Sequence, residues 1–145
     1  MTVAGPAAAA EHESRYVGVL VGRPAEEVYA YAADPANLPE WAAGLASGVE
    51  HEEGRWFAAS PMGRVELRFA EPNRLGVLDH DVVQADGRTT SNPLRVVAAP
   101  GGSEVVFTVR RRGMSDAELE RDVAAVRADL ENLARIVEER AGATA

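Results

Sequence analysis

The sequence predicts an α+β fold in which a curved antiparallel sheet of about seven strands wraps around one long C-terminal helix. A single helical repeat runs from Ser115 to about Arg140, and turn signals recur upstream of it at intervals typical of an antiparallel meander. No other segment predicts a helix long enough to cover the apolar side of this one, so its partner must be a sheet. Two short helices are expected between the first strand and the second.

The C-terminal helix has a well-marked start and a narrow apolar stripe. Ser115 and Glu118 form a capping box, in which each side chain bonds the other residue's backbone amide. The apolar residues that follow recur at alternating spacings of four and three, which places them on one line of the helix: Leu119, Val123, Val126, Leu130, Leu133 and Val137. Charges of alternating sign suit the opposite, solvent-facing side: Arg127, Glu131, Arg135 and Glu139. Gly142 is expected to end the helix.

The region before Ser47 predicts one strand and two short helices. Period-two alternation predicts a strand over residues 15–22, with its valines on one face. Pro24 is expected at the first position of a helix whose buried face is formed by Val28, Tyr31 and Ala32. Asp34 and Pro35 predict the N-cap and first residue of a second helix, which buries Leu38 and Trp41.

After Ser47 the pattern becomes that of strands joined by turns. The turn signals are Glu53-Gly54, Pro61-Met62-Gly63, Pro72-Asn73, Asp86-Gly87 and Pro100-Gly101-Gly102. Between them, two segments show clear alternation of apolar and polar residues, one over residues 64–69 and one over residues 105–109. The sequence therefore predicts about six antiparallel strands in this region.

Two segments resemble a known family. Arg23-Pro24-Ala25-Glu26-Glu27-Val28-Tyr29 and Asp34-Pro35-Ala36-Asn37-Leu38-Pro39-Glu40-Trp41 are similar to the opening of START/Bet v 1-like (SRPBCC) proteins, among them polyketide cyclases/dehydratases and many bacterial single-domain proteins. The resemblance covers roughly residues 15–140 and implies the helix-grip fold. It also implies a hydrophobic small molecule bound between sheet and helix, on which some members catalyse reactions. It supplies no active-site motif.

Composition narrows the function classes. The net charge of −8 disfavours nucleic acid as a partner, and the basic run Arg110–Arg112 is expected to be the solvated end of a strand. The chain has no cysteine and its three histidines are scattered, so neither a metal site nor a cofactor is expected. No apolar run is long enough to span a membrane, and residues 1–14 lack the features of a signal peptide, so a cytoplasmic location is expected. Residues 1–14 are expected to form a disordered tail, and residues 15–141 a single domain.

Strand alternation nominates two polar residues for the wall of the cavity. If Leu78 and Val82 face inward, so does His80; if Leu94 faces inward, so does Asn92. A cavity histidine could act as a general acid or base, because its pKa lies near neutrality, and an asparagine could bind a carbonyl or enolate oxygen. In the competing interpretation His80 bonds a backbone or carboxylate group, or lies on an outward polar edge, and Asn92 satisfies backbone disturbed by the following proline.

The other candidate ligand contacts are apolar. Together with the two polar residues, the predicted ligand-binding set is Trp41, Phe69, His80, Asn92, Phe107, Val126 and Leu130. Alternation allows only one of Trp56 and Phe57 to face inward, and Tyr29 and Tyr31 lie on different helix faces. For Trp41 and the phenylalanines, a core role competes with ligand contact.

Three hypotheses for the function follow. The first is non-enzymatic binding of a hydrophobic or aromatic small molecule. The second is a cyclase/dehydratase-like enzyme that uses His80 as acid/base and Asn92 as orienting group, without metal or organic cofactor. The third is a protein-interaction domain like that of related co-chaperones, which needs an exposed apolar patch that the sequence does not reveal. The edge strands of a curved sheet leave room for a homodimer.

Overall fold

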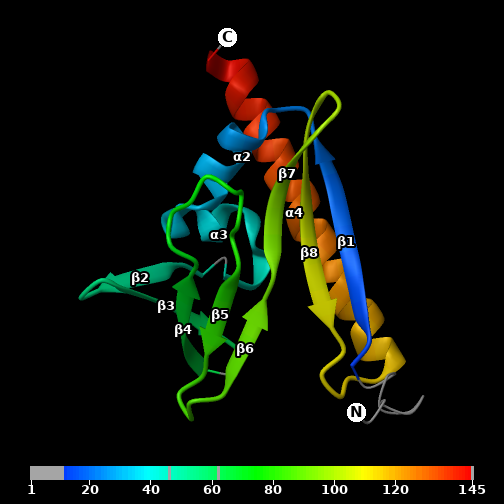
Figure 1. Ribbon diagram of the computed structural model, residues 1–145. Helices are drawn as coiled ribbons and strands as arrows, with labels where there is room; N and C mark the ends of the chain where they lie inside the picture. The colour runs from blue at the N-terminus through cyan, green and yellow to red at the C-terminus, as the bar shows by residue number, and fades with distance from the viewer. Residues whose placement is uncertain (1–11, 46, 62, 145) are drawn as a thin grey trace.

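The computed structural model describes residues 12–45, 47–61 and 63–144, and it shows a curved antiparallel sheet with a long C-terminal helix packed on it (Figure 1). The strands are β1 (Ser14–Val21), β2 (Val49–Glu52), β3 (Arg55–Ser60), β4 (Gly63–Phe69), β5 (His80–Val83), β6 (Thr89–Asn92), β7 (Leu94–Ala99) and β8 (Gly102–Arg110). The helices are α2 (Ala25–Ala32), η1 (Pro35–Asn37), α3 (Leu38–Trp41), η2 (Ala43–Leu45) and α4 (Asp116–Thr144). The expected tail lies outside the described residues as far as residue 11, and Ser14 already belongs to β1.

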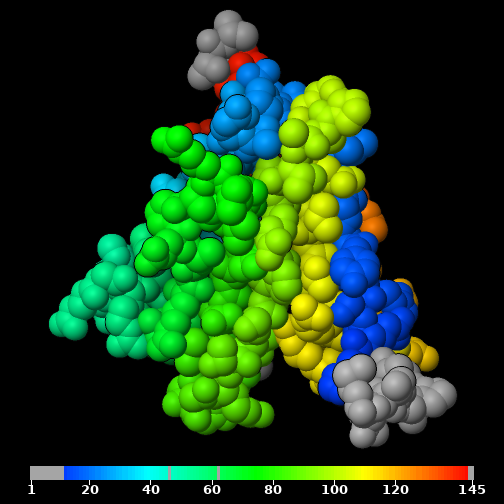
Figure 2. All heavy atoms as spheres, in the orientation of Figure 1, coloured from blue at the N-terminus to red at the C-terminus, as the bar shows by residue number. Residues whose placement is uncertain are grey.

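The strands form two hydrogen-bonded sets that meet at Pro93. Strands β2-β3-β4-β5-β6 form one hydrogen-bonded set and β1-β8-β7 the other, all antiparallel. Alternation runs through residues 90–98, but the structure has two strands there, because proline has no amide hydrogen for the ladder. The Pro93 carbonyl accepts from Thr108 N (3.1 Å) and the Leu94 carbonyl from Leu78 N (2.8 Å), so the two sets stay joined. Figure 2 shows the β2–β3 and β5–β6 hairpins projecting from the body.

Helix α4 begins as predicted and ends later than predicted. Ser115 Oγ accepts from Glu118 N (3.2 Å) and Glu118 Oε1 accepts from Ser115 N (3.1 Å), which is the capping box. The expected stop at Gly142 is wrong, because the helix continues to Thr144. Gly142 does not adopt a positive φ, and a glycine inside a helix costs only about 1 kcal/mol relative to alanine. Its alanine neighbours therefore carry the helix through it.

The apolar stripe of α4 is buried unevenly. Leu119, Leu130, Leu133 and Val137 are at most 3% exposed, whereas Val123 and Val126 between them are only partly buried. The helix packs chiefly on β1, and also on β8, α2 and α3, with no comparable packing on β3 to β6 among the described residues. The α4 backbone therefore lies closer to β1 and β8 than to the β3–β6 half of the sheet.

The short helices form a lid, defined here as residues 25–45 (α2 to η2). The predicted buried residues are confirmed: Val28, Tyr31, Ala32, Leu38 and Trp41. Asp34 Oδ1 accepts from Ala36 N (3.0 Å), as expected of an N-cap, whereas α2 begins one residue after the predicted start, with Pro24 as its N-cap. Two α4 side chains fasten the lid, since Asp129 accepts from Ala43 N (3.1 Å) and Asn132 donates to the Glu40 carbonyl (2.9 Å).

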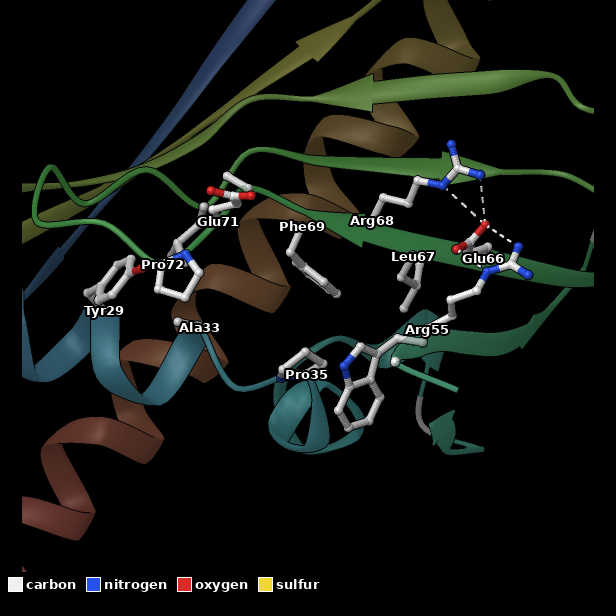
Figure 3. A pocket seen from close by; sticks show the side chains of 14 residues that line it. Tyr29, Ala33, Pro35, Arg55, Glu66, Leu67, Arg68, Phe69, Glu71 and Pro72 are labelled. Carbon is white, nitrogen blue, oxygen red and sulfur yellow. Dashed lines mark hydrogen bonds and ion pairs between the residues drawn. The ribbon is translucent and has the colours of Figure 1, made fainter. Parts of the chain in front are cut away.

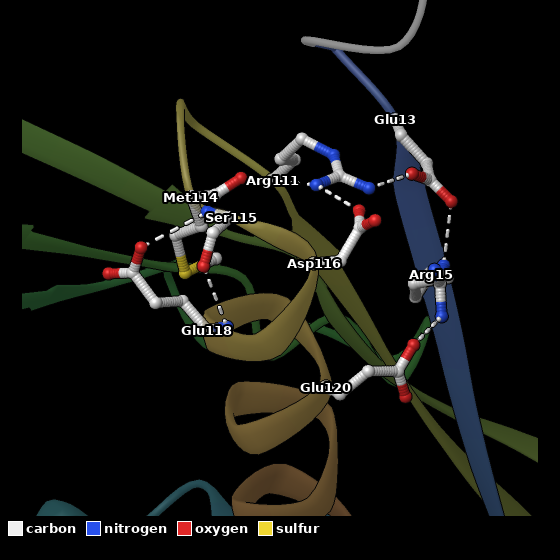
Figure 4. A network of polar contacts seen from close by, with 8 residues as sticks. All are labelled: Glu13, Arg15, Arg111, Met114, Ser115, Asp116, Glu118 and Glu120. Atoms are coloured by element: carbon white, nitrogen blue, oxygen red, sulfur yellow. Dashed lines mark hydrogen bonds and ion pairs between the residues drawn. The ribbon is translucent and has the colours of Figure 1, made fainter.

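Arg111 corrects the expectation that the basic run is solvated. Its side chain is 13% exposed and forms ion pairs with Glu13 (2.5 Å) and Asp116 (2.8 Å), which Figure 4 shows at the meeting point of β1, β8 and α4. Glu13 also pairs with Arg15, which reaches Glu120 on α4 (2.7 Å). The arginine between two exposed neighbours thus ties three elements together, which alternation along one strand does not reveal.

We expect Arg111→Ala to lower the urea midpoint of unfolding more than Arg110→Ala does. Arg110 is exposed and donates only to Ser14 Oγ (3.2 Å) among the described residues, so its loss breaks no ion pair. The measurement is urea unfolding of both variants, followed by circular dichroism at low and high salt. Equal midpoints would contradict the network's role, and an Arg111 effect that does not shrink in salt would mean that packing, not charge, is responsible.

The outward face of β1 carries an exposed pair of apolar side chains that was not predicted from the sequence. Tyr16 and Leu20 are 72% and 70% exposed, on the side of the strand opposite Val17 and Val21. Alternation along β1 could have predicted this exposure, because every second residue of a strand packed on a helix faces away from the helix.

Candidate functional site

A pocket of about 450 Å³ lies between the lid and the inner face of the sheet (Figure 3). We call it the lid pocket and define it by Tyr29, Ala33 and Pro35 on the lid side and Trp56, Leu67, Phe69 and Leu78 on the sheet side. Figure 3 shows Leu67 and Phe69 projecting from β4 toward Pro35. Larger or comparable hollows exist elsewhere, but this one combines lid residues with several inward-facing residues of the sheet. It is therefore the candidate ligand site.

The strand register explains why these side chains share a face. Trp56 lies opposite Leu67, Leu67 opposite Val82, and Phe69 opposite His80. Alternation then turns Phe57 outward, where the guanidinium groups of Arg64 and Arg55 lie over its ring (4.0 and 5.1 Å from the centroid). The ambiguity between Trp56 and Phe57 is thereby resolved in favour of Trp56.

Charged side chains at this edge of the pocket belong to the outer face of the sheet. Glu66 accepts from Arg55 (2.8 and 2.9 Å) and from Arg68 (3.1 Å), and Figure 3 shows this group on the side of β4 away from Phe69. The two arginines lower the pKa of the Glu66 carboxyl to about 2. The carboxylate is thus ionised and fully engaged, which suits a structural ion pair and not an acid or base in the pocket.

A loop over residues 70–79 closes one side of the lid pocket. Asn73 organises it: its Oδ1 accepts from Leu75 N and Val77 N, both at 3.0 Å, and its Nδ2 donates to the Glu71 and Val77 carbonyls. Asn73 N also donates to Tyr29 Oη (3.0 Å). Tyr29 is therefore fixed at the pocket wall, and of the two lid tyrosines only Tyr29 lines this pocket.

His80 faces inward, as alternation predicts, and the alternative of an outward polar edge does not hold. Its ring lies between those of Phe69 and Phe107, with centroids 5.7 and 6.1 Å away. Nδ1 lies 3.0 Å from the Leu78 carbonyl oxygen, which can only accept, so Nδ1 carries the proton and Nε2 is the acceptor of the neutral ring. Part of the competing interpretation is thus confirmed, since His80 does bond the backbone, but through one nitrogen only.

Asn92 lies directly opposite His80 on β6. Its Nδ2 donates to the Thr90 carbonyl over a long 3.3 Å, and no described residue donates to its Oδ1. Pro93 leaves the alternation intact, because Asn92 and Leu94 share the inner face. The structure therefore brings His80, Asn92, Phe69 and Phe107 together on the inner face of the sheet.

The remaining predicted contacts are placed in or near the core. Trp41 is 6% exposed within the lid, and its Nε1 has no acceptor among the described residues. Leu130 is 1% exposed and is a core residue, whereas Val126 is only partly buried on the stripe of α4. The lid-side residues Ala33 and Pro35 are not among the predicted contacts, because their positions depend on how the lid packs on the sheet.

Burial lowers the pKa of His80, against the raising effects of the Leu78 hydrogen bond and of Asp79 and Asp81. We therefore expect His80 to titrate below the ordinary value of about 6.5. The unfolded chain binds this proton more readily than the folded one, so the neutral ring's contribution to stability is lost as pH falls below about 6.5. Urea unfolding at pH 7 and at pH 5 should show the wild type losing stability relative to His80→Phe. A constant difference between the two proteins would contradict the assignment.

The described residues contain no group of three or more His, Cys, Asp or Glu residues placed to hold a metal ion. Separately, none of the helices in the described ranges is both long and apolar enough to cross a membrane.

A protein-family model matches most of the chain. The model of the family described as "Polyketide cyclase / dehydrase and lipid transport" matches residues 14–138. A search of curated proteins found no match.

Solved structures agree on the fold. An uncharacterized protein from Bacillus thuringiensis matches with a TM-score of 0.67 and 15% identity, over 86% of this chain and 98% of that one. DR_A0006 from Deinococcus radiodurans matches with a TM-score of 0.60 and 24% identity, over 85% and 95% of the two chains. Ara h 8.0201 matches with a TM-score of 0.61 and 15% identity, over 88% and 98%. At these identities the likeness concerns the fold alone.

Proposed function

This chain belongs to the polyketide cyclase/dehydrase and lipid transport family of SRPBCC (Bet v 1-like) proteins, and we propose that it binds an apolar, aromatic small molecule in the lid pocket. Hydrophobic ligands are typical of the family. The observation that carries the proposal is the lining of the pocket, where Trp56, Leu67, Phe69 and Leu78 face Tyr29 and Pro35. A volume of about 450 Å³ is in the usual range for small-molecule sites, which are mostly apolar with few polar groups.

A second candidate function is catalysis of the cyclase/dehydratase kind. It is favoured by one observation: His80 keeps Nε2 free of hydrogen bonds from described residues while Asn92 lies opposite it. A neutral imidazole there can take a proton from an acidic C–H or O–H group, and the Asn92 amide can bind the oxygen that becomes negative. A His80→Ala variant with undiminished turnover of any accepted substrate would remove this candidate.

Filling the lid pocket tests the binding proposal. Ala33 lines the pocket at the end of α2, so Ala33→Phe occupies part of its volume without removing a core side chain. We expect N-phenyl-1-naphthylamine, a neutral fluorescent probe, to bind the wild type saturably and Ala33→Phe about tenfold more weakly.

Ala36→Phe is the matched control, because Ala36 is exposed on the neighbouring turn and does not line the pocket. It should bind the probe like the wild type. Absence of saturable binding to the wild type, or equal binding by the Ala33 variant, would overturn the proposal. Thermal unfolding of both variants checks that the fold is retained.

A further inference from the structure

From the geometry around His80 we infer that the ligand presents a neutral O–H or N–H donor, of the phenol or enol kind, to His80 Nε2, and that the site discriminates against carboxylates. This inference rests on the proposed function, since it names the chemical class that the lid pocket accepts. It makes His80 a specificity-determining residue whether or not a reaction follows.

The hydrogen bond to Leu78 determines which imidazole nitrogen of His80 can accept a hydrogen bond. The Leu78 carbonyl holds the proton on Nδ1 (3.0 Å), so Nε2 of the neutral ring offers a lone pair and no proton. No described residue forms a hydrogen bond with Nε2, and this atom is not fully buried. A ligand donor is the group that this nitrogen lacks. A ligand without such a donor leaves Nε2 facing an apolar group and loses the hydrogen bond.

Phe69 and Leu78 lie between the lid pocket and His80. Phe69 lines the pocket, and its ring centroid lies 5.7 Å from that of His80. Leu78 also lines the pocket, and its carbonyl holds the histidine. His80 itself does not line the lid pocket, but lines a neighbouring hollow of about 360 Å³ together with Asn92. Phe69 lines both hollows, so a ligand in the lid pocket meets the imidazole only where it extends past this ring.

The described inner-face residues of β3 to β6 offer no positive partner for an anion. Alternation places these residues on the inner face of β3 to β6: Trp56, Ala58, Ser60, Val65, Leu67, Phe69, His80, Val82, Thr90 and Asn92. None of them is a lysine or arginine, and Arg55 and Arg68 are committed to Glu66 on the outer face. An anion beside a neutral histidine flanked by two phenylalanine rings would be desolvated without compensation.

Binding of three related probes tests the inference: 2-naphthol, 2-methoxynaphthalene and 2-naphthoate at neutral pH. They share one ring system and present a neutral donor, an acceptor only, and a carboxylate. Calorimetric titration of the wild type should show 2-naphthol binding about tenfold more tightly than 2-methoxynaphthalene, the ratio expected for one hydrogen bond to a partly buried acceptor, and 2-naphthoate binding most weakly.

Variants assign the preference to His80. In His80→Phe the preference for 2-naphthol over its methyl ether should disappear, while Asp81→Asn, a change on the outer face of the same strand, should retain it. Imidazole ¹⁵N spectra of the wild type give a readout that does not depend on any variant folding. The His80 Nε2 signal should shift on adding 2-naphthol and stay in place with 2-methoxynaphthalene.

The outcomes separate the two proposals. If no probe binds, the lid-pocket function and this inference both fall. If the naphthol and its methyl ether bind equally, or the carboxylate binds best, the pocket function stands and the donor inference is overturned. A preference that survives in His80→Phe also overturns it, since another group would then be the acceptor.

Discussion

Leu133→Ala is expected to lower the free energy of unfolding by about 2 to 5 kcal/mol, the range for deleting a large buried side chain and leaving a cavity. Leu133 is fully buried near the C-terminal end of the α4 stripe, and the helix packs against the sheet and the lid. Urea unfolding followed by circular dichroism measures the change.

Leu20→Ala is the control for this prediction, because it removes the same atoms from a side chain that is 70% exposed. Its effect should stay within about 0.5 kcal/mol. Comparable losses at the two positions would show that α4 does not form the core as described.

Gly76→Ala is expected to destabilise the protein by more than about 3 kcal/mol, from backbone strain and a steric clash together. Gly76 has a φ of +74°, and an added Cβ would lie 2.1 Å from the Val96 carbonyl oxygen. The Gly76 carbonyl also accepts from Val96 N (2.9 Å), so the loop cannot move away without losing its contact with β7.

Gly54→Ala separates the two causes. Gly54 has a nearly equal φ of +78° in the β2–β3 turn, but an added Cβ there meets nothing within 4 Å. It should cost only the strain of a left-handed residue, about 1 to 2 kcal/mol. Chemical unfolding of both variants gives the difference, and equal losses would mean that the close approach at Gly76 is relieved cheaply.

Local signals predicted most of the fold. The Ser115–Glu118 capping box, the Asp34 N-cap and the buried faces of the lid helices depend on residues a few positions apart, and all are confirmed. The predictions failed at residues whose contacts come from segments distant in the sequence. Arg111 is held by Glu13, just before β1, and by Asp116 in α4, and the strands on either side of Pro93 pair with different neighbours.

The candidate site was predicted in part. Alternation alone placed His80 and Asn92 on the inner face, because period two is insensitive to how the sheet curves. It could not choose between Trp56 and Phe57, since either register buries one aromatic ring. The sequence predicts a cavity between the sheet and the C-terminal helix, whereas the lid pocket lies between the sheet and the lid and is not lined by Val126 or Leu130. Its walls at Ala33 and Pro35 could not be predicted, because they depend on the tertiary position of the lid and of the loop over residues 70–79.

The most direct test of the central claim, that the lid pocket is the ligand site, is a ¹H–¹⁵N and methyl NMR titration with 2-naphthol. We expect the largest chemical-shift changes at residues that line the pocket: Ala33, Leu67, Phe69 and Leu78. Changes confined to Glu27, Asp34 and Arg140, around the hollow between α2 and the end of α4, would contradict it.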